Sequence, residues 1–99
     1  MKWKSIIQSE REYCFLCARN GINNDYGLQK HHIFDGANRK HSEETGLYVA
    51  LCIPHHTDGK EAVHNNRENS LTLMRLAQEA YEEEHTREEF MQIFGKNYL

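Results

Sequence analysis

The chain has 99 residues, which is enough for one domain with a small core. Its hydrophobic fraction of 38% excludes a disordered chain but is low for a core that must be stable unaided, so it favours a structural metal. The net charge of −3 does not suggest a polyanion partner, and residues 68–99 hold seven acidic side chains against three basic ones. Nucleic acid could still bind locally, since its affinity depends on the few cations that touch phosphates.

The sequence contains no apolar run of membrane-spanning length, and the basic start at residues 1–4 is not followed by an apolar stretch. We therefore expect a cytoplasmic protein with no membrane partner. The chain has three cysteines, an odd number, and disulfides are rare in a reducing cytosol. Metal binding is the better explanation of these thiols.

The first half of the chain predicts a short helix followed by two strands. Residues 1–13 place Trp3, Ile6 and Ile7 at helical spacing and predict a short packing helix. Residues 28–34 form a short strand candidate, and the polar residues 35–46 are typical of a loop. Residues 47–51 are the clearest strand, because they are compact, β-prone and preceded by a glycine.

The second half predicts helices. Pro54 suits the first turn of a helix, where its missing N–H would have no partner. Apolar residues at helical spacing predict C-terminal helices over about 69–95. Thr86 and Glu89 form a capping-box pattern at the start of the last helix, and Gly95 is a natural stop.

These helices could also form a homodimer. Their apolar residues exceed what a small core is expected to bury, and an exposed apolar patch often marks an interface. The residues concerned are Leu71, Met74, Phe90 and Phe94.

Two short motifs predict a structural zinc site. Cys14 and Cys17 form a C-x2-C pair, and Cys52 with His55 forms C-x2-H. A structural zinc ion uses four such ligands in a tetrahedron, and both spacings fit a knuckle or the first turn of a helix. A redox role for Cys14 and Cys17 would need a thioredoxin-like strand–helix–strand context, which this sequence does not supply.

A histidine-rich segment follows the first motif. His31 and His32 are neighbours in a predicted strand, so their side chains should point to opposite faces. One could bind a metal while the other contacts water, and neutral imidazole is suited to both tasks. His56 and His64 lie further along the chain.

Taken together, these motifs resemble the HNH (ββα-metal) endonucleases. The likeness lies in Lys30-His31-His32-Ile33-Phe34, in Leu51-Cys52-Ile53-Pro54-His55-His56 and in Val63-His64-Asn65. It is greatest to small bacteriophage and prophage members that carry a C-x2-C knuckle before the His-His pair. The resemblance implies one α+β domain over residues 1–99, with a zinc-stapled, treble-clef-like ββα-metal core at about 12–66 and flanking helices.

The resemblance also assigns roles in the hydrolysis of DNA phosphodiester bonds. It implies that His31 and His56 bind a divalent cation (Mg²⁺, Mn²⁺, Ni²⁺ or Zn²⁺) and that His32 is the general base. His64 is a candidate third ligand, but it lies eight residues after His56 and can join only if the chain turns near Gly59.

Substrate contacts are expected beside this site. Arg39 and Lys40 could bind phosphates of the DNA partner, although both also suit a solvated loop, and Asn38 is a third candidate for a substrate contact. The middle Asn of the family falls on Leu47 in this chain. Because that Asn normally orients the catalytic loop, Asn38 could substitute for it, or the base could be held differently.

Two other readings compete with the nuclease. The first is a zinc-stabilised module of the same fold that binds nucleic acid or protein without catalysis, and Leu47 is the best argument for it. The second is a structural two-metal protein in which every histidine is a ligand. The pairing of His32 with His31 and His56 favours the enzyme, because a binding module has no need of a water-activating residue.

Overall fold

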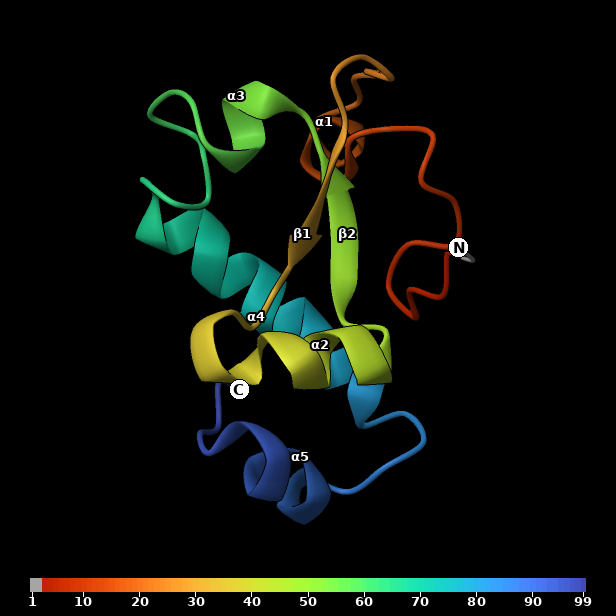
Figure 1. The fold of residues 1–99 in the computed structure, drawn as a ribbon, viewed down its shortest axis with the longest axis vertical. Helices are drawn as coiled ribbons and strands as arrows, with labels where there is room; N and C mark the ends of the chain where they lie inside the picture. The colour runs from red at the N-terminus through yellow and green to blue at the C-terminus, as the bar shows by residue number, and fades with distance from the viewer. Residues whose placement is uncertain (1–2) are drawn as a thin grey trace.

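A two-stranded antiparallel sheet lies at the centre of the computed structural model, which describes residues 3–99 (Figure 1). Strand β1 (Gln29–His32) pairs with β2 (Tyr48–Leu51), with His31 opposite Val49 in the register. Both predicted strands are confirmed, although each is shorter than expected. All four residues of β2 are buried, which explains why its continuous apolar run was the clearest strand in the sequence.

Two short helices lie at one end of this sheet. Helix α1 (Phe15–Arg19) contacts β2, and α3 (Ile53–His56) contacts β1. Pro54 stands in the first turn of α3, as its missing N–H predicts. Figure 1 places α1 and α3 together at the end of the sheet, so the segments that carry the two cysteine motifs are neighbours in space.

The segment predicted as a polar loop over 35–46 is instead helical. It forms a 3-10 turn, η1 (Gly36–Asn38), and then α2 (Arg39–Thr45), which contacts β1. The helix shows no apolar periodicity because its anchor is a buried hydroxyl: Ser42 Oγ accepts a hydrogen bond from the N–H of Phe34 and donates one to its carbonyl. Gly46 ends the helix in the left-handed conformation, at φ +76°.

The packing helix predicted for residues 1–13 is absent from residues 3–13, and residues 1–2 lie outside the described part. This segment runs along the outer edge of β2 instead. Ser5 Oγ donates to the Tyr48 carbonyl, and Gln8 Oε1 accepts from the N–H of Ala50. An unpaired strand edge needs such partners, and this requirement outweighs a weak helical periodicity.

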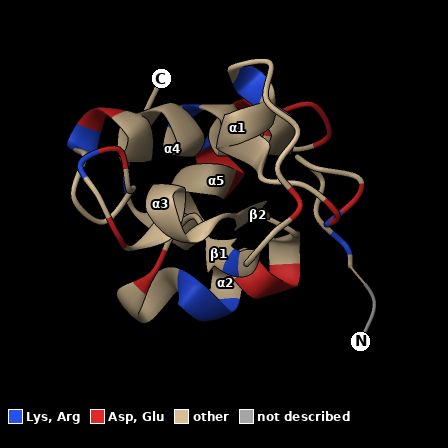
Figure 2. Ribbon diagram, turned by 90° about the horizontal axis from the view of Figure 1, so that it is seen from above, with Lys and Arg blue, Asp and Glu red and all other residues tan. Residues whose placement is uncertain are grey.

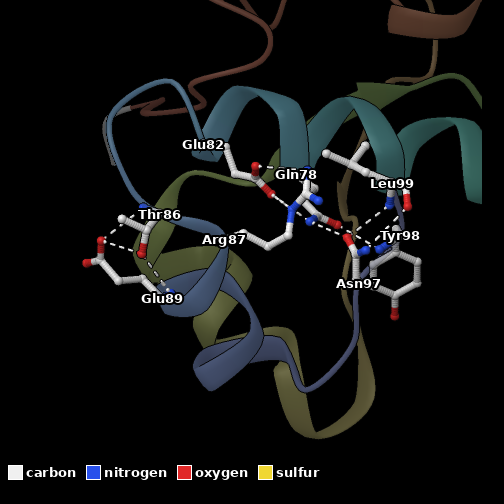
Figure 3. A network of polar contacts seen from close by, with 8 residues as sticks. All are labelled: Gln78, Glu82, Thr86, Arg87, Glu89, Asn97, Tyr98 and Leu99. Carbon is white, nitrogen blue, oxygen red and sulfur yellow. Dashed lines mark hydrogen bonds and ion pairs between the residues drawn. The ribbon is translucent and has the colours of Figure 1, made fainter.

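Helices α4 (Arg67–Tyr81) and α5 (Arg87–Phe94) confirm the C-terminal prediction. Asn66 caps α4 by accepting a hydrogen bond from the first turn, so this helix begins slightly earlier than expected. Thr86 and Glu89 form the predicted capping box, since each side chain bonds the other's backbone N–H (Figure 3).

A buried amide fixes the end of the chain to α4. Gln78 Nε2 donates to Asn97 Oδ1 at 2.8 Å, and its Oε1 accepts from the N–H of Tyr98 at 2.8 Å (Figure 3). Arg87 Nε contacts Glu82 Oε2 at 3.2 Å across the turn between the helices. These contacts hold α5 and the C-terminal tail close to α4.

The apolar residues of the C-terminal helices largely enter the chain's own core. Phe90 is 0% exposed and Phe94 5% exposed, and both rings pack against Phe34. Leu71 and Met74 are half-buried. Less apolar surface is therefore left exposed on these helices than the sequence suggested, and the homodimer stays a prediction. Within residues 3–99, no helix has the length and hydropathy needed to span a bilayer.

The close approach of the N-terminal segment to Gly46 can be tested by substitution. A Cβ at Gly46 would collide with the Lys4 carbonyl oxygen, whereas one at Gly95 would meet nothing within 4 Å, although Gly95 has almost the same φ of +77°. Each Gly→Ala change should cost about 1–2 kcal/mol of backbone strain. We expect Gly46→Ala to lower the free energy of unfolding in urea by at least about 1 kcal/mol more than Gly95→Ala. Equal losses would contradict the close packing.

Candidate metal centres and catalytic cavity

Four side chains from the two cysteine motifs converge between α1 and α3. Cys14 is the N-cap of α1, Cys17 lies within it, Cys52 is the N-cap of α3, and His55 lies in α3. The His55 Nδ1 atom is 3.5 Å from the sulfur of Cys14 and 3.3 Å from the sulfurs of Cys17 and Cys52. The two sulfurs of Cys17 and Cys52 are 3.7 Å apart.

These separations fit a tetrahedral zinc site. Four ligands at normal zinc–sulfur and zinc–nitrogen distances stand about 3.8 Å apart for two sulfurs and about 3.6 Å for sulfur and nitrogen. The observed distances are within a few tenths of an ångström of these values. The predicted Cys14, Cys17, Cys52 and His55 set is therefore brought together and could hold a metal such as zinc.

Without a cation, the thiols of Cys17 and Cys52 are protonated at neutral pH. Burial, and then the neighbouring thiols of Cys14 and Cys52, raise the pKa of Cys17 to about 12. Burial also raises the pKa of Cys52. A divalent ion reverses this preference because it binds the thiolate, so metal uptake would release protons and weaken as the pH falls.

A second cluster contains three histidines. The ring centroids of His31 and His56 are 5.1 Å apart, those of His31 and His64 are 5.5 Å apart, and those of His56 and His64 are 5.0 Å apart. One nitrogen from each ring lies within 4.8 Å of the others. Ligands that share one ion stand about 3.0–3.4 Å apart, so small ring rotations would close this set around a cation.

The turn required to bring His64 into the cluster is present. Gly59 has φ +115°, and the N–H of Val63 returns to the His55 carbonyl at 2.8 Å. Three asparagine amides hold the loop from its far side by bonding backbone carbonyls. Asn65 bonds Gly59 at 3.0 Å, Asn66 bonds Lys60 at 3.2 Å, and Asn69 bonds Glu61 at 2.8 Å.

The orientation of His56 depends on a residue that the sequence analysis missed. His56 Nδ1 is 2.7 Å from Gln29 Oε1, so Nδ1 carries the proton and Nε2 keeps its lone pair. An outer partner of this kind fixes the tautomer of a metal-binding imidazole. The alternation of side chains in a strand could have indicated Gln29, because Gln29 and His31 lie two residues apart on one face of β1.

Burial keeps His31 neutral. Its exposed fraction is 7%, and desolvation, followed by the charges of His56, His64 and His32, lowers its pKa to about 3. Burial and the charge of His64 also lower the pKa of His56. Neutral imidazole is the form that binds metal, so the lowered pKa values of both residues favour the form that can act as a ligand.

His32 has different surroundings from its neighbour. Its Nε2 is 2.7 Å from Glu43 Oε1 of α2, and the same oxygen is 2.7 Å from Lys30 Nζ. These contacts lower the pKa of Glu43, with the Lys30 hydrogen bond as the largest cause and His32 as the next. Glu43 was missed in the sequence because α2 was predicted to be a loop. The Lys-x-His spacing of β1, which places Lys30 and His32 on one face, was the only available hint.

His32 and the three clustered histidines line one cavity of about 230 Å³. Its other lining residues are Lys30, Asp35 and Arg39. Lys40 lies beside an adjoining hollow that also contacts His32, whereas Asn38 lines neither space. A larger hollow of about 510 Å³ lies between the N-terminal segment and α2, but it contains no histidine or cysteine. Because its histidines can bind a metal, the smaller cavity is the better candidate for the functional site.

The position at which the HNH resemblance would expect an Asn is occupied by a core residue. Leu47 is 0% exposed, and its carbonyl accepts a hydrogen bond from the N–H of Ile33 at 3.1 Å. Asn38 is the N-cap of α2 but makes no side-chain capping bond. The base candidate His32 is held by Glu43 rather than by an asparagine.

Comparison with known proteins identifies no family for this chain. A scan against protein-family models, a search of curated proteins and a search of solved structures each returned no match. Functional inference therefore depends on the site itself.

The charge near the site is mixed. Helix α2 carries both basic and acidic residues, whereas α3 has no Lys, Arg, Asp or Glu (Figure 2).

Metal analysis would test the cysteine cluster. We expect the purified chain to contain one tightly bound zinc ion, and His55→Ala to lose it, because removal of one of four ligands should cost more than about 100-fold in affinity. His85→Ala is the matched control, since the His85 side chain is 46% exposed, pairs with Glu89, stacks on Tyr81 and belongs to neither ligand set. Zinc content by mass spectrometry and the thermal unfolding midpoint would both be measured. Full zinc retention by His55→Ala would contradict the assignment.

The neutral state of His31 predicts a dependence of stability on pH. The folded pKa of His31 lies below its unfolded value of 6.5, so the unfolded chain binds more protons in acid and the free energy of unfolding falls below about pH 6.5. Between pH 7 and pH 5 this loss should be about 2 kcal/mol. The control is His31→Gln, which keeps the cysteine cluster but lacks the titrating group. The free energy of unfolding of both chains would be measured in urea at several pH values. An equal fall of this free energy with pH in the two chains would contradict the prediction.

Proposed function

We propose that this chain is a metal-dependent endonuclease of the HNH type that hydrolyses phosphodiester bonds of DNA. The observation that carries the proposal is the different environment of two neighbouring imidazoles. His31 faces His56 and His64, whereas His32 is bonded to Glu43, yet all of these histidines line one cavity. A metal ligand set beside a separate base is the arrangement that metal-assisted hydrolysis requires.

The residues of the cavity divide the chemistry between them. His32 takes a proton from a water molecule, and the water oxygen forms a bond to phosphorus. The P–O3′ bond then breaks, and its electron pair stays on the 3′ oxygen, which takes a proton from solvent. A divalent cation held by His31, His56 and His64 would neutralise the charge that develops on the phosphate and the leaving oxygen. The products are a 5′-phosphate and a 3′-hydroxyl.

Substrate binding would depend on few cations. Arg39 lines the cavity, and its guanidinium can bind two phosphate oxygens at once. Lys40 lies at the adjoining hollow. Because the net charge is −3, we expect DNA binding to be local, centred on these residues, and weakened by salt.

One observation favours a second candidate, a zinc-stabilised binding module without catalysis. The family's middle Asn is replaced by the buried Leu47, so the anchor that this Asn provides is missing. In that case the histidine cluster would be structural, and DNA would bind without being cut.

Cleavage of supercoiled plasmid separates the two candidates. With Mg²⁺, Mn²⁺, Ni²⁺ or Zn²⁺ the chain should yield nicked or linear DNA. His32→Ala should lower the rate on the order of 10²- to 10⁴-fold, because proton transfer to the base is lost. Band intensities on a gel over time give the rate.

His41→Ala provides the control for this experiment. His41 lies in α2, is 40% exposed and contacts Glu44 at 3.5 Å, outside the cavity lining. It should cut like the parent chain, and both variants should retain zinc. If His32→Ala cuts as fast as the parent, His32 is not the base. If the parent cuts neither DNA nor RNA with any ion, the binding module is the better description.

A further inference from the structure

The carboxylate of Glu43 makes the shortest contact to the base candidate. Its Oε1 atom is 2.7 Å from His32 Nε2, and the His32 side chain is only 11% exposed. His32 also packs against the Tyr48 ring, with centroids 5.9 Å apart at 61°. The ring therefore has a neighbour on its flank and a hydrogen-bond partner at one nitrogen, which leaves it little freedom to rotate.

Lys30 holds the carboxylate in place. Its Nζ atom is 2.7 Å from the same Glu43 oxygen and 4.1 Å from the centre of the Tyr48 ring. An ammonium group so close favours the ionised carboxylate, which can only accept hydrogen bonds. His32 Nε2 must then be the donor.

We propose that Glu43 is a positioning residue that keeps the proton of His32 on Nε2 and leaves Nδ1 as the atom that accepts the proton of the attacking water. This inference rests on the proposed function. A neutral imidazole has one donor and one acceptor nitrogen, so a carboxylate that occupies the donor side determines which atom is the base. When Nδ1 takes the proton as the water oxygen bonds to phosphorus, the carboxylate stabilises the imidazolium through the hydrogen bond that already exists.

This role also accounts for the buried leucine in the position of the family's middle Asn. Leu47 cannot orient a base, because its side chain has no polar atom and lies in the core. Helix α2 approaches β1 and presents Glu43 to His32 from a different element. The anchor of His32 is thus supplied from α2.

Substitutions at Glu43 test the inference through kinetics. Glu43→Ala should lower kcat on the order of 10- to 100-fold, with KM changed by less than about twofold. Glu43→Gln should keep part of the activity, because its amide oxygen can still accept the hydrogen bond, and Glu43→Asp should recover more than Ala. Glu44→Ala is the matched control, since it removes the same charge from the next residue of α2 and should cut like the parent chain.

A spectroscopic measurement is independent of activity. In ¹⁵N NMR spectra of the full zinc-loaded chain, His32 should carry its proton on Nε2 with a strongly downfield proton resonance, and Glu43→Ala should lose that resonance. A proton on Nδ1 of His32 in the parent, or unchanged kcat in Glu43→Ala, would overturn the inference. If the parent cuts no DNA while the NMR signature is as expected, the proposed function fails but the positioning of His32 by Glu43 stands.

Discussion

Cys52 and His55 hold the start of α3 against Cys14 and Cys17 at the start of α1, and this contact closes one end of the two-stranded sheet. Helices of four or five residues are unstable alone, so their geometry depends on this cluster. His56 follows His55 directly, and one peptide bond therefore joins the cysteine cluster to the histidine cluster. The position of His56 therefore depends on the thiols around His55, although those thiols take no part in the proposed chemistry.

The parts of the fold that sequence reasoning predicted are those with a strong local signal. The buried strand 48–51 is continuous and apolar, and the capping box of Thr86 and Glu89 specifies its own hydrogen bonds. The convergence of the cysteine motifs also followed from ligand spacing, because four such ligands have few other uses. His64 could be placed only conditionally, since its position depends on the turn at Gly59 rather than on any periodicity.

The missed parts depend on polar contacts between distant segments. Helix α2 is anchored by the buried Ser42 hydroxyl, and no hydrophobic pattern can reveal such an anchor. The segment 3–13 follows the edge of β2 because Ser5 and Gln8 supply hydrogen bonds there, which required knowledge of which strand edge was open. Once α2 was assigned as a loop, Glu43 could not be placed beside His32. A wrong local assignment thus hid a residue of the candidate site.

The loop that precedes His64 has a consequence for redesign. Its carbonyls are bonded by the amides of Asn65, Asn66 and Asn69, so its course is determined by main-chain atoms and by residues that follow it. Lys60 and Glu61 are both exposed, and of their two side chains only that of Glu61 makes a polar contact with this amide set. Because only the backbone carbonyl of Lys60 takes part in these bonds, its side chain can be exchanged while the backbone that carries His64 stays where it is.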